Sequence, residues 1–199
     1  MLRHLAKAAL SAGIIAAALS VAAPAFATTT FTVSGGTSWT GVNSGPIMAG
    51  GFSCSVSTMA GTIKNGSGLS GTDIGEITSW TFGNSSKPCT GSSGSTMTGA
   101  QASGVNAHIN FVSFSNGVIS GSVSNIDFIV HISDLFGTCT AAVSGTANFT
   151  YSGGDLDFTG TGTLTVSSAT GSGCAGVITA GDSLTLSGKY VITPPWMVS

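Results

Sequence analysis

The chain has 199 residues, of which only seven are acidic and five are basic. Charged residues make up 6% of the sequence, whereas about 25% is usual for a soluble domain. Residues 28–199 contain three lysines and no arginine, and nearly half of them are Gly, Ser or Thr. A nucleic-acid-binding surface needs clustered Lys or Arg, so this composition excludes one. It also excludes a polybasic segment that would bind a membrane surface.

Residues 1–27 have the pattern of an export signal. Arg3 and Lys7 make the start positive, an apolar run follows over 8–23, and Ala25-Phe26-Ala27 has the small-x-small pattern of a signal-peptidase site. The apolar run is shorter than the roughly 20 residues of a membrane-spanning helix. We therefore expect a cleaved signal peptide at 1–27, a single β domain at 28–193 and a short C-terminal tail at 194–199. The protein is then secreted, and it is either released or associated with the cell envelope.

The mature chain is expected to form β-strands. Glycine recurs every few residues, Ser and Thr compete with helices for backbone hydrogen bonds, and strong helix formers are sparse. Apolar and polar residues alternate, which is the period of a half-buried strand. In chain order, the expected strands are Phe31–Ser34, Phe52–Thr58, Ile74–Phe82, Thr96–Ala102, Val105–Phe111, Ile126–Ile132, Cys139–Tyr151, Leu156–Val166 and Leu184–Ile192.

Turn signals separate these strands. The strongest is Asn116-Gly117, because both central residues of a tight hairpin turn need positive φ. We predict an all-β fold of about ten short strands, arranged as a single β-sandwich or a Greek-key-like barrel and stabilised by two disulfides.

The disulfides are predicted from four cysteines: Cys54, Cys89, Cys139 and Cys174. Export and an even number of cysteines favour disulfide bonds. Cys54 and Cys89 are 35 positions apart, Cys139 and Cys174 are also 35 apart, and the two segments share similar internal motifs. We predict the pairs Cys54–Cys89 and Cys139–Cys174, while the other two pairings stay open. Structural zinc sites place cysteines two to four residues apart, which does not occur here.

Two segments resemble a known family. The first contains Cys54, residues 66–79 and Cys89-Thr90-Gly91, and the second contains residues 173–182 and 186–190. Together they are similar to a family of small secreted actinobacterial proteins, over about residues 50–193. Members often carry a Pro-Trp pair after the second cysteine, where this chain has residues 98–101, Thr-Gly-Ala-Gln. The resemblance implies export and an actinobacterial origin, and it transfers no activity and no functional residues.

Four acidic side chains are the candidates for metal binding. Asp155 and Asp157 are two positions apart beside a Gly-Gly turn, so on a strand they point to one face, where they are candidate calcium ligands. A solvated hairpin flank explains the same pair, because charges there discourage edge-to-edge pairing. Asp73 and Glu76, which also flank a turn, have the same interpretation.

Catalytic groups are scarce. A serine hydrolase needs a nucleophile supported by histidine, but the chain has no Gly-x-Ser-x-Gly motif. A surface hydrogen bond at a strand end, near Asp134, explains His131, and His108 lies within an alternating strand. We expect no catalytic residues, no cofactor and no metal site beyond the calcium candidates.

A threonine rank is the most unusual pattern. Thr159, Thr161, Thr163 and Thr165 occur at every second position, so one strand face would carry only threonine. Such ranks resemble those of ice-binding proteins, which usually repeat them on neighbouring strands. Threonine is also common on the solvated faces of strands, so both interpretations stay open.

These observations favour a non-enzymatic protein of the cell surface or extracellular space that is structural or binds a partner. Its expected partners are cell-wall polymers or further copies of itself, through a Ser/Thr-rich surface or exposed strand edges. We expect no nucleic-acid partner and no membrane contact. Two alternatives remain. One is a pore-forming β-barrel subunit of an outer envelope layer, and the other is a carrier or inhibitor that binds a small molecule in an apolar cleft. An enzyme is the least supported class.

Overall fold

The computed structural model describes residues 29–199, so the expected signal peptide lies outside the described residues. Its regular elements are β-strands and two short 3-10 turns, which confirms the all-β class. Among residues 29–199, no helix has the length and hydrophobicity needed to cross a membrane. The strands are β1 (Thr30–Ser34), β2 (Ser38–Asn43), β3 (Ile47–Ala49), β4 (Phe52–Cys54), β5 (Ser57–Ile63), β6 (Gly66–Ser70), β7 (Gly75–Phe82), β8 (Cys89–Thr90), β9 (Thr96–Gln101), β10 (Ala107–Ser115), β11 (Val118–Asp134), β12 (Gly137–Ser152), β13 (Asp155–Gly162), β14 (Leu164–Thr170), β15 (Ser183–Leu184), β16 (Leu186–Thr193) and β17 (Met197–Val198); the 3-10 turns are η1 (Ser92–Gly94) and η2 (Ser172–Cys174).

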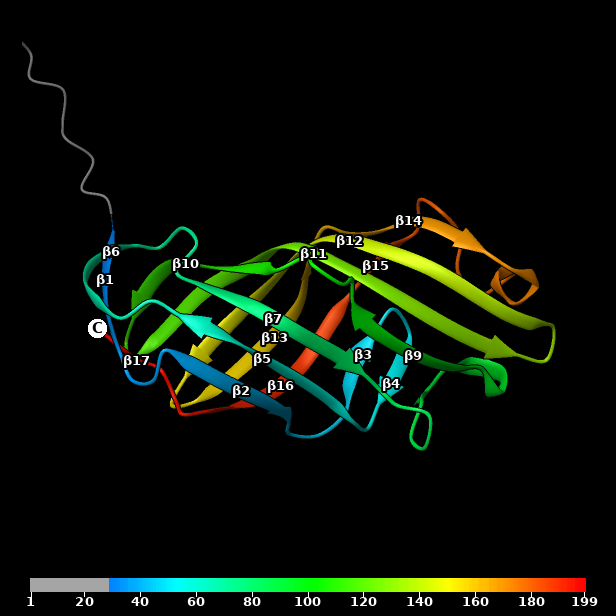
Figure 1. Cartoon of the computed structure of the whole chain (residues 1–199), viewed down its shortest axis with the longest axis horizontal. Coiled ribbons are helices and arrows are strands. Elements are labelled where there is room, and N and C mark those ends of the chain that lie inside the picture. The colour runs from blue at the N-terminus through cyan, green and yellow to red at the C-terminus, as the bar shows by residue number, and fades with distance from the viewer. Residues whose placement is uncertain (1–28) are drawn as a thin grey trace, which may run out of the picture.

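Eight strands form a closed antiparallel sheet (Figure 1). β2 pairs with β5, and the pairing continues through β7, β10, β11, β12, β13 and β16, which pairs back with β2. Going round the ring, the strands follow their order along the chain. Of the two expected architectures, the sandwich and the Greek-key-like barrel, the pairings agree with the closed one. The strand order within the closed sheet is up-and-down and not Greek-key.

β11 and β12 are the longest strands and extend beyond this ring. Past a bulge at Asn125, whose φ is +54°, β11 leaves β10 and pairs with β9, while β12 leaves β13 and pairs with β14. β8, β4 and β3 continue the sheet from β9 to β16. β14 pairs with β15, which precedes β16 in the chain. The same sheet thus wraps the other half of the molecule with a partly different set of strands.

The interior is apolar and its centre is aromatic. The Trp80 ring lies 5.0 Å from Phe128 and 5.1 Å from Phe158. Trp80 Nε1 donates to the Tyr190 hydroxyl over 3.0 Å, and the Tyr190 and Ser57 hydroxyl oxygens are 2.6 Å apart. Because the Ser57 hydroxyl donates to the Thr81 carbonyl, Tyr190 must donate to Ser57. This buried chain of donors is therefore completely paired, as buried polar groups need to be.

The predicted crosslinks and turn are confirmed. Cys54–Cys89 joins β4 to β8, and Cys139–Cys174 joins β12 to η2. Asn116 and Gly117 have φ of +52° and +77°, and they close the hairpin between β10 and β11 with Ser115 opposite Val118.

Two expectations differ from the structure. The described chain has seventeen strands instead of about ten, because turns and bulges divide the predicted segments and because weakly patterned segments such as Gly66–Ser70 also pair. Residues 194–199, expected to be a tail, pack as part of the fold. The Trp196 side chain is 4% exposed and lies 5.3 Å from Trp39, and Met197–Val198 pairs with β1.

Candidate functional site

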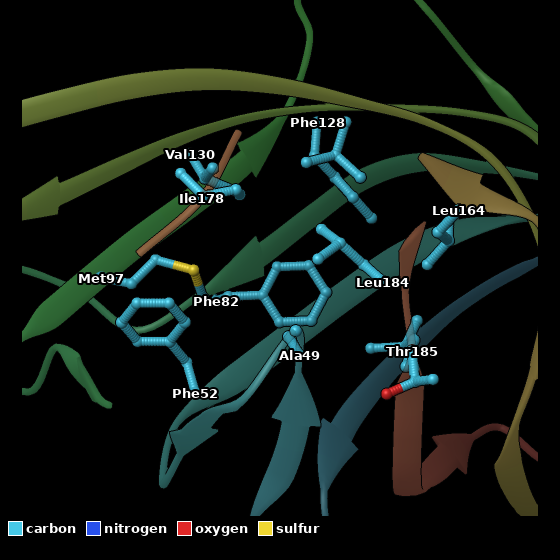
Figure 2. A pocket seen from close by; sticks show the side chains of 13 residues that line it. Ala49, Phe52, Phe82, Met97, Phe128, Val130, Leu164, Ile178, Leu184 and Thr185 are labelled. Atoms are coloured by element: carbon cyan, nitrogen blue, oxygen red, sulfur yellow. The ribbon is translucent and has the colours of Figure 1, made fainter. Parts of the chain in front are cut away.

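An apolar cavity lies in the half of the molecule that carries both disulfides (Figure 2). Side chains on the inward faces of the strands converge on it, and every one except Thr185 is apolar. The lining residues are Ala49, Gly50, Phe52, Phe82, Met97, Phe128, Val130, Val143, Leu164, Ile178, Leu184, Thr185 and Leu186. Because they come from strands far apart in the sequence, only closure of the sheet brings them together.

Ile178 lines the cavity from the loop between η2 and β15, and hydrogen bonds hold this loop in place. Ile178 N and Val177 N both donate to the carbonyl of Cys174, which the disulfide ties to β12. At the far end of the loop, Gly181 N donates to Val166 O, and Val166 N donates to Asp182 O. The Asp182 side chain accepts from the Thr179 N–H over 2.7 Å. The loop therefore holds Ile178 against the cavity by fixed contacts at both ends.

The cavity reaches the surface on one side. Gly50 and Leu184 are partly exposed there, and Thr185 is exposed. Gly50 N donates to Thr185 O over 2.9 Å, which fixes the β3–β4 turn to the segment between β15 and β16. Gly50 has φ of +57°, and a Cβ at this position would lie 3.1 Å from Leu184 Cδ2. The mouth is thus narrow, with the Leu184 side chain against the bare glycine backbone.

The size and lining of the cavity decide what it can hold. Its volume is about 40 Å³, enough for a short alkyl group and far below the roughly 300 Å³ of a site that encloses a whole drug-sized ligand. A water molecule inside would lack the two to four polar partners that it needs. The cavity can therefore take the apolar end of a molecule whose remainder stays at the mouth.

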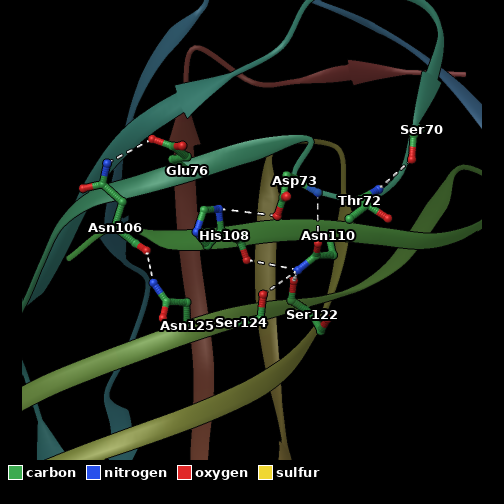
Figure 3. A network of polar contacts seen from close by, with 10 residues as sticks. All are labelled: Ser70, Thr72, Asp73, Glu76, Asn106, His108, Asn110, Ser122, Ser124 and Asn125. Atoms are coloured by element: carbon green, nitrogen blue, oxygen red, sulfur yellow. Dashed lines mark hydrogen bonds and ion pairs between the residues drawn. The ribbon is translucent and has the colours of Figure 1, made fainter.

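A polar network is the second candidate site (Figure 3). Asp73 Oδ1 lies 3.4 Å from His108 Nδ1, and both side chains are partly exposed. Asn110 is the centre of the network, since its Oδ1 accepts from Asp73 N over 3.0 Å and its Nδ2 donates to Ser124 Oγ over 2.9 Å. Nearby, Asn106 Nδ2 donates to Glu76 Oε2 over 3.0 Å.

This network has a clear structural task. Asp73 has φ of +50°, and its backbone N–H is held by Asn110 on β10. The contacts therefore fix the turn between β6 and β7 against the outside of the closed sheet. An ion pair that is this exposed contributes at most about 1 kcal/mol. Asp73 and Glu76 thus lie in a surface network that supports a turn, in agreement with their interpretation as flanking residues.

The calcium candidates lie beside a lysine. Asp155 Oδ2 accepts from Lys189 Nζ over 3.0 Å, and Lys189 on β16 is directly opposite Asp157 on β13. The hydrogen bond and the charge of Asp155 raise the pKa of the Lys189 ammonium, and Asp157 adds to this effect. In residues 29–199, no group of three or more His, Cys, Asp or Glu side chains could hold a metal ion. The cation that Asp155 contacts is the ammonium group of Lys189.

The remaining predicted residues lie on the outer surface. His131 Nδ1 and Thr140 Oγ1 on the neighbouring strand are 3.2 Å apart, which is a surface contact of the kind expected, although its partner is not Asp134. The threonine rank does not lie on a single strand, because β13 ends at Gly162 and Thr165 belongs to β14. Thr159 and Thr161 share a hydrogen bond, while Thr163 bonds to Thr146.

No protein-family model, curated protein or solved structure matches the chain. Membership of the secreted actinobacterial family stays a prediction.

Sequence reasoning missed the cavity, although several of its lining residues lie within the expected strands. Phe52, Phe128, Val130 and Leu164 are buried, but alternation reports only that a side chain points inward. Alternation does not report whether side chains from the opposite side of the sheet pack against that inward side chain. One usable signal was Gly50-Gly51 between two apolar strands, because Gly50 lacks a side chain at the point where Leu184 approaches the backbone.

Proposed function

We propose that the protein is a secreted, non-enzymatic binding protein that takes the apolar end of a small ligand into this cavity. The observation that carries the proposal is an almost wholly apolar lining that reaches the surface beside Gly50 and Leu184. Two disulfides, which are compatible with an extracellular protein, hold the walls on either side. The proposal takes up the carrier alternative of the sequence analysis.

The force available is burial of hydrocarbon. Each buried methylene contributes about 0.8 kcal/mol, so a cavity of this size supplies roughly 1–2 kcal/mol. The ligand must therefore gain the rest of its affinity outside, where the Gly50 turn and Thr185 offer backbone and hydroxyl groups. This arrangement favours molecules with a short or branched alkyl end and a polar body.

The arrangement of polar and apolar side chains supports binding over a pore. A water-filled pore is polar inside and apolar outside. In this chain the inward residues, such as Phe82, Phe128 and Phe158, are apolar and buried, while the outward faces of the strands are rich in Ser and Thr.

Xenon is a suitable probe because one atom matches the cavity in size and has no polar groups. The ¹²⁹Xe chemical shift should change with protein concentration more steeply for the wild type than for Ala49→Leu, which enlarges a side chain that lines the cavity. Ala100→Leu makes the same change on the exposed face of β9 and serves as the matched control. The proposal is wrong if xenon responds equally to the wild type and Ala49→Leu while both remain folded.

A further inference from the structure

The turn between β11 and β12 carries two apolar side chains into solvent. Leu135 is 91% exposed and Phe136 is 76% exposed, the two highest values among the large apolar residues described. The turn between β11 and β12 lies at the end of the molecule opposite its C-terminus (Figure 1). Val177, on the loop after η2, lines a shallow hollow together with Leu135 and Phe136. We call Leu135 and Phe136 the apolar tip.

The apolar tip is held in place by polar contacts beneath it. Asp134 Oδ1 accepts from the backbone N–H groups of Phe136 and Gly137, over 2.7 and 3.0 Å. Ser172 Oγ donates to the carbonyl of Phe136 over 3.0 Å. The Cys139–Cys174 disulfide ties β12 to the same turn that supplies Ser172. The backbone of the turn that carries the two side chains is therefore held in place, so little further backbone ordering is needed when they bind.

Hydroxyl groups surround the tip, and charge is nearly absent. The hollow is lined by the exposed Ser92 and Ser93 and by the buried Ser95, whose hydroxyl donates to the Ser92 carbonyl; Asp134 is its single ionisable group. The Oδ1 atom of that carboxylate already accepts from two backbone N–H groups. Ser133 and Thr138, the next outward residues along the hairpin, are exposed hydroxyls. Along the hairpin axis, polarity thus changes from hydrocarbon at the end to hydrogen-bonding groups behind it.

We propose that the apolar tip docks the protein on an uncharged lipid–water interface. The hydroxyl collar matches the headgroup layer, and the tip matches the hydrocarbon beneath it, which is the order of polarity that an interface offers. Two side chains on a convex turn need a phase that deforms around them, and fluid lipid does so without a preformed pocket.

This mode of docking differs from the one that the composition excludes. The expectation of no membrane contact rested on the lack of a polybasic segment, which attracts anionic lipid. The tip acts by hydrophobic insertion instead. Binding should therefore not require anionic lipid and should not fall when salt is raised.

The expected affinity is modest. Full burial of a Leu or Phe side chain is worth about 1.5 kcal/mol or more, so each should change the partition coefficient about tenfold. Both together give reversible association, which suits a protein that is free to leave the surface.

Co-sedimentation with vesicles tests the proposal, using protein recovered from the culture medium after export. One set of vesicles is phosphatidylcholine alone, and the other is an equal mixture of phosphatidylcholine and phosphatidylglycerol. Leu135→Ser combined with Phe136→Ser should weaken partitioning about a hundredfold on both, about tenfold for each side chain removed. Val112→Ser, a similar change at another exposed apolar residue, should leave it unchanged.

A fluorescent reporter locates the contact. Trp39, Trp80 and Trp196 are all buried, so Phe136→Trp adds the single exposed indole among the described residues. Its emission should shift to shorter wavelength with vesicles and be quenched by brominated acyl chains. The proposal is overturned if the wild type does not sediment, if the double serine variant sediments equally, or if binding needs anionic lipid. Because these experiments do not involve the cavity, their failure leaves the proposed function standing.

Discussion

Replacing Tyr190 with phenylalanine tests the buried hydrogen-bond chain at the centre of the fold. The Tyr190 hydroxyl accepts from Trp80 Nε1 and donates to Ser57. Without it, the indole N–H is a buried donor with no partner, whereas Ser57 still donates to Thr81 O. One unpaired buried donor costs about 1–3 kcal/mol. We therefore expect Tyr190→Phe to lower the free energy of unfolding by about 2 kcal/mol.

Urea unfolding with the disulfides intact measures this loss, because the slope of the unfolding free energy should not change. A double-mutant cycle with Ser57→Ala isolates the bond between the two hydroxyls. The double variant should lose about 1 kcal/mol less free energy of unfolding than the sum of the losses of the two single variants. The reason is that each single variant already removes the bond between the two hydroxyls, so the sum counts this bond twice. A loss below about 0.5 kcal/mol for Tyr190→Phe, or simple additivity in the cycle, would refute the described network.

Three further predictions concern pH, charge and crosslinking. Burial raises the pKa of both tyrosines, Tyr190 and Tyr151, above the usual value of 10.0, so the unfolded state loses their protons first. These groups should leave the free energy of unfolding unchanged below pH 10 and lower it above pH 10, by up to about 1.4 kcal/mol per pH unit for each tyrosine. Chemical unfolding at several pH values, together with tyrosinate absorbance, measures this change. A free energy of unfolding that stays constant above pH 10 contradicts the burial of the two tyrosines. Asp155→Asn should cost less than about 1 kcal/mol in urea unfolding, because both side chains of the pair are partly exposed to solvent, and a larger loss would show that the pair has a structural role. Replacing Cys139 and Cys174 with alanine should cost about 4 kcal/mol for a 35-residue loop, and an unchanged urea midpoint would contradict this.

The sequence predicted well the features that depend on residue type and local spacing. The hairpin at Asn116-Gly117 follows from the φ requirement of two residues, and the equal spacing of the cysteines favoured the disulfide pairs that the structure has. The alternation over residues 107–111 identifies buried positions correctly, because strand geometry alone determines which face a side chain occupies.

The alternation of apolar and polar residues does not indicate which strands pair with each other. β11 pairs with β10 along its first half and with β9 along its second half, and the bulge at Asn125 has no clear signature in a Ser/Asn-rich segment. The same gap explains why the C-terminal segment was expected to be a tail. Trp196 gains its burial from Trp39 and Tyr151, which are far away in the sequence.

The candidate site depends on this long-range information even more strongly. The cavity is bordered by side chains from β4, β7, β9, β11 and β14 that do not meet across the space between them. No local sequence pattern encodes the distance between these strands. The apolar tip is different, since Asp134-Leu135-Phe136-Gly137 between two alternating strands is visible in the sequence. Two large apolar residues in a turn, where polar residues are usual, were the available signal.

The most direct test of the central claim is to identify what the cavity holds in the native host. Protein purified from the culture of the producing organism would be extracted with organic solvent, and the extract analysed by mass spectrometry beside that of Ala49→Leu and Ala100→Leu expressed in the same host. The account predicts one class of compound with a short or branched alkyl end, near equimolar with the wild type and Ala100→Leu and depleted in Ala49→Leu. Equal amounts of the same compounds in all three, or no compound above a blank in any, would contradict it.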